Sequence, residues 1–381
     1  MIYALAQWLQ TSAGTAGFPG ARLFTYITFR AALAALIAFL ICIYAGPRVI
    51  AKLKALGFQD REKDDDASLA KLWSQTDKRN TPTMGGVFLI PSILIATILF
   101  ARLDNIFVIV GICLAAFFCA IGFLDDWAKL RKEKGGGLKR REKLLWQSVG
   151  ALIAVAVLFW FARETDRSSL LRIYPPFFKD FAIDLPAIGI LGSGIFVIFE
   201  WFTITATGNA VNITDGMDGL AAGCTLIAAG ALGLLCYVAG HSELAQYLRV
   251  PAIHGAGELA ILASAIMGGC LGFLWFNCYP AQVFMGDTGS LSLGASLGFL
   301  AVVARQELVL PLVAGVFVAE AGSSWLQTFY FRRTGGKRLF TKAPIHHIWQ
   351  LRNYPEPKIV IRFWIVAALL ALSGVALLKL R

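Results

Sequence analysis

Residues Ile106 to Leu130 read IFVIVGICLAAFFCAIGFLDDWAKL, and this stretch decides the fold class. No charged residue occurs between Ile106 and Leu124, and a helix of that length, rising about 1.5 Å per residue, covers a bilayer core of about 30 Å. Asp125 and Asp126 follow directly. The stretch therefore predicts a membrane-spanning helix whose end carries two acids at the membrane edge.

Similar apolar runs recur along the whole chain of 381 residues. Hydrophobic residues make up 57% of the chain and charged residues only 15%, a balance outside the range of soluble globular domains. The sequence predicts an all-α integral membrane protein with about ten transmembrane helices, which form a single polytopic domain over residues 1–381. The expected spans are Thr25–Tyr44, Gly85–Phe100, Ile106–Leu124, Leu144–Phe161, Ala187–Thr205, Leu220–Val238, Leu259–Phe276, Leu291–Ala304, Leu308–Tyr330 and Ile359–Leu378.

The basic residues, which give a formal net charge of +11, are unevenly distributed. About two thirds of the 35 lysines and arginines fall in Arg48–Arg79, Lys129–Lys143 and Arg332–Lys358. Cytoplasmic loops are enriched in basic residues, and these segments follow the first, third and ninth expected spans. Both termini are therefore expected outside, on the periplasmic side. In a membrane protein this charge indicates contact with anionic lipid, and no nucleic-acid partner is expected.

Carboxylates at the C-terminal end of a helix oppose the helix dipole unless a cation compensates them. Asp125 and Asp126 occupy such an end. They suggest a divalent ion, because magnesium shared with substrate phosphates typically takes one or two carboxylates. The alternative is a solvated pair at the membrane edge that Lys129 and Arg131 neutralise.

A second polar motif, GNAVNITDGMDGL, lies between two expected spans at Gly208–Leu220. Its Asn209, Asn212, Asp215 and Asp218 recur every third residue, a spacing that would align them along one side of a helix. Amides and acids at membrane depth are costly unless they line a polar cavity or bind a ligand. We therefore expect this row to bind substrate.

Three further cytoplasmic connections carry polar motifs. In DKRNTPTMGG, residues 77–86, Lys78 beside a turn can donate to a phosphate. The alternative is an ordinary helix-entry turn with a lipid-facing lysine. In FNCYPAQVFMGDTGSL the glycine-rich start of a helix suits an anion, and Asp287 either caps that helix or holds a cation. APIHH contains His346 and His347, which we expect to bind phosphate because neither cysteine nor HExxH accompanies them.

Acids, amides, a lysine and two histidines on one side of the membrane require a polar, anionic ligand that binds magnesium. A nucleotide diphosphate meets these requirements. The membrane supplies the other reactant, a lipid phosphate whose second pKa of about 6 leaves it largely dianionic at neutral pH. Such an oxygen needs little help from a general base, so catalysis would rest on alignment and on charge neutralisation by magnesium.

The motifs TPTMGG, DD, GNAVNITDGMDGL, FMGDTGSL and APIHH occur in this order between Thr81 and His347. In this set the sequence resembles the bacterial phospho-N-acetylmuramoyl-pentapeptide transferases, a family of the polyprenyl-phosphate N-acetylhexosamine-1-phosphate transferase superfamily. The resemblance implies transfer of phospho-N-acetylmuramoyl-pentapeptide from UDP-N-acetylmuramoyl-pentapeptide to undecaprenyl phosphate, giving lipid I and UMP in peptidoglycan synthesis. It also implies Mg²⁺ as the cofactor, a multi-pass location in the bacterial inner membrane, and a homodimer.

The resemblance also implies roles for the residues that match its motifs. Asp287 and Asp126 would bind the metal, Asp125 and Asp126 would serve the metal or the lipid phosphate, and His346 would join them in the catalytic set. Asp215 and Asn277 would contact the nucleotide, Phe284 would stack on uracil, and Lys78, Thr83, Lys143 and His346 would hold phosphates or the lipid carrier. The expected substrate-binding residues are Lys78, Thr83, Lys143, Asn209, Asn212, Asp215, Asp218, Asn277, Phe284, Gln327 and His347.

Three positions depart from the family pattern. Asn80 stands in place of a glycine, Lys342 in place of a methionine, and Ile348 in place of the third residue of a histidine run. The sequence leaves open whether an acid attacks first or the lipid phosphate attacks directly; direct attack is favoured because it needs no aspartyl intermediate.

Two other functions remain as alternatives. A sister enzyme would transfer N-acetylglucosamine-1-phosphate from UDP-N-acetylglucosamine to the same lipid through a similar acidic site. A secondary transporter would place its acids near the middle of the bilayer and show related halves, whereas the acids here lie at loop edges. Glu200 and Glu320 fall within expected spans, and we expect each to pair with a partner inside the bundle.

Overall fold

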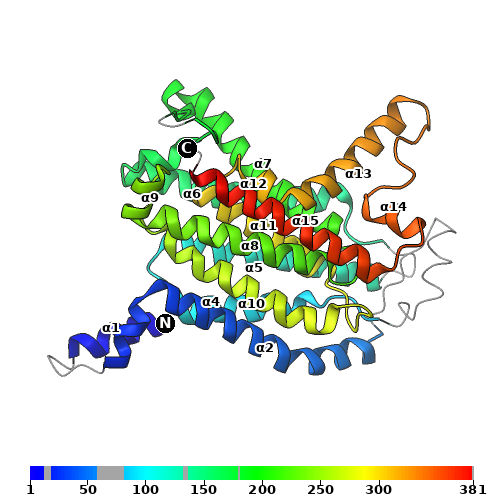
Figure 1. The fold of residues 1–381 in the computed structure, drawn as a ribbon, viewed down its shortest axis with the longest axis horizontal. Helices are drawn as coiled ribbons and strands as arrows, with labels where there is room; N and C mark the ends of the chain where they lie inside the picture. Colours follow the sequence, from blue (N-terminus) through cyan, green and yellow to red (C-terminus); the bar gives the residue numbers. More distant parts are fainter. Residues whose placement is uncertain (13–18, 58–80, 132–135, 179–180, 380–381) are drawn as a thin grey trace.

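The computed structural model describes residues 1–12, 19–57, 81–131, 136–178 and 181–379 (Figure 1). The α-helices over these ranges are α1 (Ile2–Ser12), α2 (Ile27–Ala55), α4 (Gly86–Phe100), α5 (Ile106–Arg131), α6 (Arg140–Glu164), α7 (Ile190–Thr214), α8 (Leu220–Gly240), α9 (Ser242–Leu248), α10 (Leu259–Asn277), α11 (Gly286–Val303), α12 (Leu310–Val313), α13 (Gly315–Arg333), α14 (His346–Leu351) and α15 (Glu356–Ala376). Short 3₁₀ helices are η2 (Pro19–Thr25), η4 (Ser168–Leu171), η5 (Leu185–Ile188), η6 (Ala256–Glu258) and η7 (Leu377–Lys379).

The all-α membrane class is confirmed. Within the described ranges, eight helices are long and apolar enough to cross a membrane: α2, α5, α6, α7, α8, α10, α11 and α15. Helix α4 is apolar but shorter. Each of these nine helices overlaps one of the expected spans.

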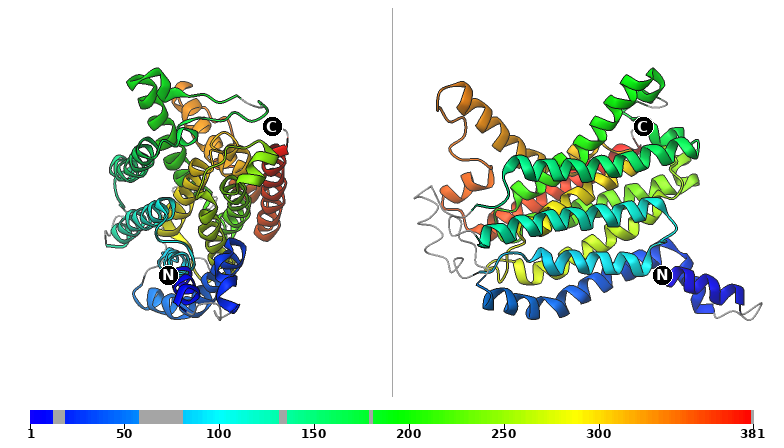
Figure 2. Two further views of the ribbon diagram at one scale, coloured as in Figure 1. Left: turned by 90° about the vertical axis from the view of Figure 1, so that its left-hand side faces the viewer. Right: turned by 180° about the vertical axis from the view of Figure 1, so that it is seen from behind.

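The remaining expected span, Leu308–Tyr330, does not form one helix. It divides at Ala314 into the short α12 and the longer α13. Helix α13 carries Glu320, Gln327 and two terminal arginines, and this polar content makes it less apolar than the other long helices. Figures 1 and 2 show that α13 leans away from the bundle, as does the first part of α7. The expected number of ten spans is therefore not reached among the described helices.

Helices α10 and α11 form the centre of the bundle. Helix α10 packs against α2, α4 and α8, and α11 packs against α5, α7 and α8. Every residue of α11 from Thr288 to Val303 is buried. Its Gly294 and Gly298 touch α7 so closely that an added Cβ would lie 2.6 Å from the Thr207 carbonyl oxygen and 3.0 Å from that of Thr203, respectively. Small residues four positions apart allow such close contact between membrane helices.

Buried ion pairs connect the helices inside the bundle. Glu200, which we expected to pair with a partner, lies 2.9 Å from Arg305, and Arg305 also lies 3.1 Å from Glu307. A second pair was not predicted: the two terminal guanidinium nitrogens of Arg30 each donate to Glu258 at 2.7 Å. Charges at this depth are stable only when they are paired.

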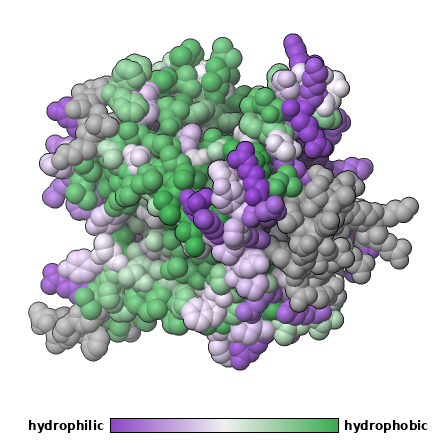
Figure 3. All heavy atoms as spheres, turned by 45° about the vertical axis from the view of Figure 1, so that its right-hand side comes forward, coloured by the Kyte–Doolittle hydropathy of each residue, from purple (hydrophilic) through white to green (hydrophobic). Residues whose placement is uncertain are grey.

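The ends of the bundle differ in character. Helix α1 and the last turn of α15 lie at one end of the molecule, and α14 lies at the other (Figure 1). Hydrophobic side chains cover much of the visible surface of the bundle, whereas hydrophilic side chains gather toward its ends (Figure 3). The assignment of the α14 end to the cytoplasm remains a prediction from the basic segments.

Candidate active site

Three carboxylates from two helices meet near the end of α5 and the start of α11. Each of Asp125, Asp126 and Asp287 contributes an oxygen, and these oxygens lie within 4.8 Å of one another. The backbones can approach because α5 has a glycine at position 122, where an added Cβ would lie 2.2 Å from the Asp287 carbonyl oxygen. Asp125 and Asp126 are each only 3% exposed. The fold thus brings together the three acids that the sequence analysis assigned to catalysis.

Asp126 caps helix α11 from outside that helix. Its carboxylate accepts hydrogen bonds from the backbone N–H groups of Asp287 at 3.2 Å and Thr288 at 2.9 Å, and from the Thr288 hydroxyl at 2.7 Å. The first N–H groups of a helix lack partners within the helix, and a negative charge there is favourable. Asp287 was one candidate to cap this helix, but Asp126 has that role, so the Asp287 carboxylate is available for other contacts.

Two lysines compensate the acids. The Lys129 ammonium nitrogen lies 2.9 Å from Asp287, 3.1 Å from Asp125 and 3.5 Å from Asp126. Lys143, at the start of α6, lies 2.5 Å from Asp287 and 3.5 Å from Asp125. The alternative interpretation of the two adjacent aspartates as a solvated pair fails, because they are buried and share these lysines with an acid from another helix.

The acid cluster suits a divalent cation. All three groups are carboxylates, which are ligands that hard cations such as magnesium prefer. The Lys129 ammonium group already contacts all three carboxylates, so their oxygens face a common cationic position. The donor set and its arrangement therefore fit a metal ion held by Asp125, Asp126 and Asp287.

The first two residues of the predicted polar row lie on α7, and the second contacts the acid cluster. The Asn212 side-chain N–H₂ donates to Asp287 Oδ1 at 2.6 Å and to the Ser290 hydroxyl at 2.9 Å. Asn209 donates to Gln147 Oε1 on α6 at 2.7 Å and to the Thr205 carbonyl at 2.8 Å. Asn212 thus fixes Asp287, and Asn209 joins α7 to α6.

The other two residues of the row are not on the helix, so the prediction that all four lie along one side of a helical turn was wrong. Helix α7 ends at Thr214, and Asp215 is the residue that follows it. The chain then turns through Gly216 and Gly219, the latter with φ of +80°, which most side chains disfavour. Asp218 is buried in this turn, where its carboxylate accepts from the Ala281 N–H at 3.0 Å.

Three more expected substrate residues come from the segments that flank α11 and α4. Asn277 is buried; its oxygen accepts from Gly219 N–H at 3.0 Å and its N–H₂ donates to the Val283 carbonyl at 2.9 Å. Phe284 is half-buried, and its N–H donates to the Pro82 carbonyl at 2.8 Å. Thr83 lies near the acids, since a Cβ on Gly286 would be 3.1 Å from its hydroxyl and 2.7 Å from Asp126 Oδ2. Lys78 and Asn80 lie outside the described residues.

The two histidines differ in their surroundings. His346 is fully buried, and its Nδ1 lies 2.9 Å from Glu320 on α13, which gives Glu320 the partner that we expected. His346 Nε2 faces the turn after α7, where a Cβ on Gly216 would lie 2.6 Å from it. His347 is half-buried and pairs through Nδ1 with Gln350 at 2.8 Å. His346 therefore joins α13 to the loop that follows Asn212.

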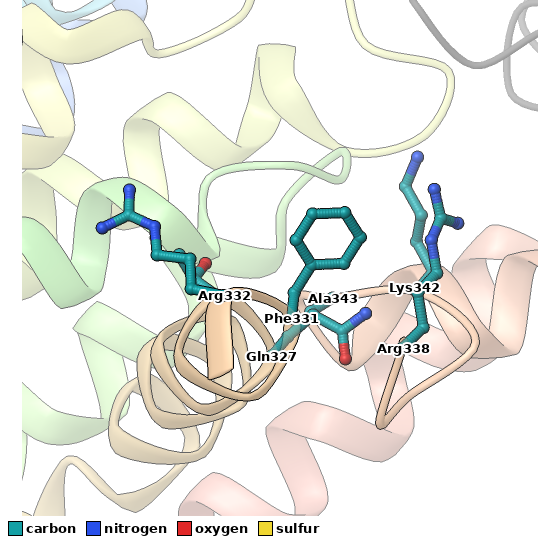
Figure 4. A pocket seen from close by; sticks show the side chains of 7 residues that line it. Gln327, Phe331, Arg332, Arg338, Lys342 and Ala343 are labelled. Carbon is teal, nitrogen blue, oxygen red and sulfur yellow. The ribbon is translucent and has the colours of Figure 1, made fainter. Parts of the chain in front are cut away.

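Gln327 lies on α13 and holds the loop that leads to α14. Its side-chain oxygen accepts from the N–H groups of Leu339 at 3.0 Å and Phe340 at 2.8 Å, and its N–H₂ donates to the Phe340 carbonyl at 3.1 Å. Gln327 also lines a pocket of about 280 Å³, called here the α13 pocket (Figure 4). Its other lining residues are Thr328, Phe331, Arg332, Arg338, Lys342 and Ala343.

Comparison with known proteins identifies the family. The model of glycosyl transferase family 4 matches residues 106–305, and phospho-N-acetylmuramoyl-pentapeptide-transferase signature 1 matches residues 78–90. The chain is 43% identical over 367 residues to a phospho-N-acetylmuramoyl-pentapeptide-transferase of Oleidesulfovibrio alaskensis, with 96% of this chain and 98% of that protein covered. The chain belongs to the phospho-N-acetylmuramoyl-pentapeptide transferase family. This membership confirms the transferase activity in peptidoglycan synthesis that the motifs predicted, and it favours that activity over the sister enzyme and the transporter.

In this member of the phospho-N-acetylmuramoyl-pentapeptide transferase family, several residues that build the site were not predicted from the sequence. Lys129 was considered only as a charge that neutralises the acids. It follows Asp125 by four residues and Asp126 by three, and this spacing places it on the same side of the helix as both. Gln147 lies one helical turn after Lys143 and belongs to none of the motifs. Glu320 was recognisable as an unusual acid within an expected span, but the sequence did not indicate that His346 is its partner.

Proposed function

We propose that this transferase moves phospho-N-acetylmuramoyl-pentapeptide from UDP-N-acetylmuramoyl-pentapeptide to undecaprenyl phosphate, with Mg²⁺ bound by Asp125, Asp126 and Asp287. An oxygen of the lipid phosphate attacks the β-phosphorus of the donor. The bond from this phosphorus to the oxygen that bridges the two phosphates breaks, and UMP leaves with the electron pair. The product is lipid I. The convergence of three carboxylates and two lysines carries this proposal.

The acids would hold the metal, and the protein fixes each of them separately. Asn212 orients Asp287, the start of α11 orients Asp126, and the Leu138 N–H donates to Asp125 Oδ1 at 2.7 Å. Bound magnesium would neutralise charge on the donor diphosphate and on the departing UMP. Fixed ligands avoid reorganisation during the reaction, and this preorganisation is a main source of electrostatic catalysis.

Lys129 and Lys143 would hold phosphate oxygens at the edge of the cluster. Both ammonium groups already lie against Asp287, and a lysine can turn between a carboxylate and a phosphate because it acts as a compact charge on a flexible stem. A dianionic lipid phosphate needs no proton removed before it attacks. We therefore assign the lysines to alignment and charge balance, and no acid to covalent attack.

The remaining polar residues would form the donor site around the turn after α7. Asp218 and Asn277 direct polar atoms to backbone groups of neighbouring segments, so we propose that they shape the nucleotide site. Direct contacts with the donor would come from the other expected substrate residues. These are Lys78, Thr83, Asn209, Asp215, Phe284, Gln327, His346 and His347.

The proposed setting is the bacterial inner membrane, with the acid cluster at its cytoplasmic face. The basic segments support this orientation through the positive-inside tendency. The homodimer that the family resemblance implies is part of the same proposal.

The test uses the purified chain in detergent with undecaprenyl phosphate and magnesium. We expect UMP release and lipid I formation from UDP-N-acetylmuramoyl-pentapeptide, and no UMP from UDP-N-acetylglucosamine. Chelation of magnesium with EDTA should stop turnover, and added Mg²⁺ should restore it. Selective turnover of UDP-N-acetylglucosamine would refute the proposed donor.

A further inference from the structure

The α13 pocket differs from the acid cluster in its charge. The segment Arg332–Lys342 contains five basic residues and no acidic one, and three of these cations line the pocket: Arg332, Arg338 and Lys342. Figure 4 shows the Phe331 ring between Arg332 on one side and Arg338 and Lys342 on the other. The pocket therefore presents an apolar ring between cationic groups.

The pocket is formed in advance by contacts within the protein. Gln327 fixes residues 339 and 340 to α13 through three hydrogen bonds, which sets Arg338 opposite Arg332. At the other end of the loop, the pair between His346 and Glu320 joins the chain to α13 again. A site whose backbone is already positioned binds an anion at a lower ordering cost than one in which the loop must also order.

The same loop connects the pocket to the acid cluster. Ala343 lines the pocket and lies three residues before His346, whose ring contacts the turn at Gly216. Four residues before Gly216, Asn212 bonds Asp287. A ligand that follows the surface of this loop would thus run from the acid cluster to the α13 pocket.

The peptide part of the proposed donor has suitable chemistry for this pocket. A peptide joined through its N-terminus to the muramoyl group keeps a free carboxylate at its far end. Five extended residues span up to about 17 Å, so the peptide is long enough to place this carboxylate well away from the diphosphate. Arginine matches a carboxylate with two parallel hydrogen bonds, and Phe331 can contact an apolar side chain next to it.

We propose that the α13 pocket binds the terminal carboxylate of the donor's peptide, and that Arg338 and Lys342 contribute most of the selectivity for it. This inference rests on the proposed function, because it takes the donor to be a UDP-linked muramoyl peptide. It gives Lys342, which departs from the family pattern, a role in recognition.

The test measures equilibrium binding of two donors to the purified enzyme in phosphatidylcholine nanodiscs without undecaprenyl phosphate, so that no turnover occurs. One donor is UDP-N-acetylmuramoyl-pentapeptide, and the other is the same molecule with its terminal carboxylate converted to an amide. The wild-type enzyme should bind the carboxylate donor about tenfold more tightly, as expected for charge-assisted hydrogen bonds. The Arg338→Gln, Lys342→Met double variant should reduce this preference to less than about twofold.

Two further variants keep the test decisive. Lys337→Gln removes a neighbouring exposed charge that does not line the pocket, and it should retain the full preference. Lys342→Met alone should lower the preference by about threefold if the double variant does not fold. Equal binding of both donors by the wild type, or equal loss of affinity for both donors in the variants, would overturn the proposal.

Two added measurements are made. The first distinguishes a peptide carboxylate from a lipid headgroup as the bound anion, and the second tests the proposed function separately from the pocket. If the variants change binding of both donors alike, and only in nanodiscs with phosphatidylglycerol, the pocket holds a lipid headgroup and the proposal is wrong. UMP release with undecaprenyl phosphate is measured on the same samples. A carboxylate preference without UMP release would contradict the proposed function alone, whereas UMP release without a preference would contradict the pocket alone.

Discussion

The Lys129 ammonium nitrogen lies 2.9 Å from Asp287 Oδ2, although the two residues are 158 positions apart and belong to α5 and α11. With Lys143, the cluster sets two positive charges against three carboxylates. One negative charge remains in excess. A divalent cation would reverse this sign, and the site would then attract a diphosphate.

Replacement of Asp287 with asparagine should abolish most of the turnover while the protein still folds. Asparagine keeps the shape and the oxygen that accepts from Asn212, but it removes one charge from the group that would hold the metal. We expect a loss of at least about 100-fold in UMP release, comparable to the loss of one preorganised electrostatic group. Thermal unfolding in detergent should change little. Asp104→Asn, at an exposed acid paired with Arg102, is the matched control, and near-normal turnover of Asp287→Asn would remove Asp287 from the site.

Replacement of Lys129 with glutamine should tighten magnesium binding and lower turnover. The ammonium group contacts the same three carboxylates that would bind the metal, so its removal relieves repulsion between two cations. Loss of a phosphate-binding charge should still slow the reaction by about tenfold or more. Calorimetric titration of Mg²⁺ without substrate gives the first quantity, and UMP release gives the second. Weaker magnesium binding in this variant would show that Lys129 does not compete with the metal.

The sequence predicted the membrane helices and the acidic motifs well, because both follow from local chemistry. An apolar run of bilayer length and an acid at the end of such a run are visible without the fold. The division of the ninth span at Ala314 was not predicted, since Leu308–Tyr330 is apolar enough on average to conceal the polar residues of α13. The glycines at 216 and 219 allow the chain to break, but the three-residue spacing did not show that the helix already ends at Thr214.

Partners across helices could not be predicted. The contact of Asp126 with the start of α11 joins residues 162 positions apart, and that of Asn212 with Asp287 joins residues 75 apart. Such contacts depend on how helices pack, which one sequence does not state. The motifs therefore indicated which residues belong to the site, but not which of them support the others.

The pair between Glu320 and His346 predicts different effects for two substitutions. Both side chains are fully buried and lie 2.9 Å apart. Glu320→Leu removes the partner of a buried imidazole and should destabilise the protein by about 3 kcal/mol or more. Glu320→Gln keeps a hydrogen-bonding oxygen and should lose much less stability, while its turnover falls because His346 is held less strongly. Thermal unfolding and UMP release are measured on both variants, and equal destabilisation by Leu and Gln would argue against the pair as a support for His346.

Gln147 should act as a positioning residue for Lys143. Its side chain is fully buried on α6, one turn after Lys143, and its oxygen accepts from Asn209 at 2.7 Å. Asn209 lies three residues before Asn212, which holds Asp287. The Gln147–Asn209 bond therefore joins the helix of the lysine to the helix that orients the acid.

Gln147→Met keeps the size of the side chain but removes the acceptor for Asn209. An unsatisfied buried donor costs about 1–3 kcal/mol, so we expect a lower unfolding temperature. Because Lys143 would be displaced from Asp287, kcat should fall by about tenfold, with little change in KM for the donor. Ser148→Ala, which removes a hydroxyl bonded to the Leu144 carbonyl of the same helix, is the matched control. A rise in KM with unchanged kcat would instead mean that Gln147 contributes to donor binding, and reduced stability with unchanged kinetics would leave it a purely structural role.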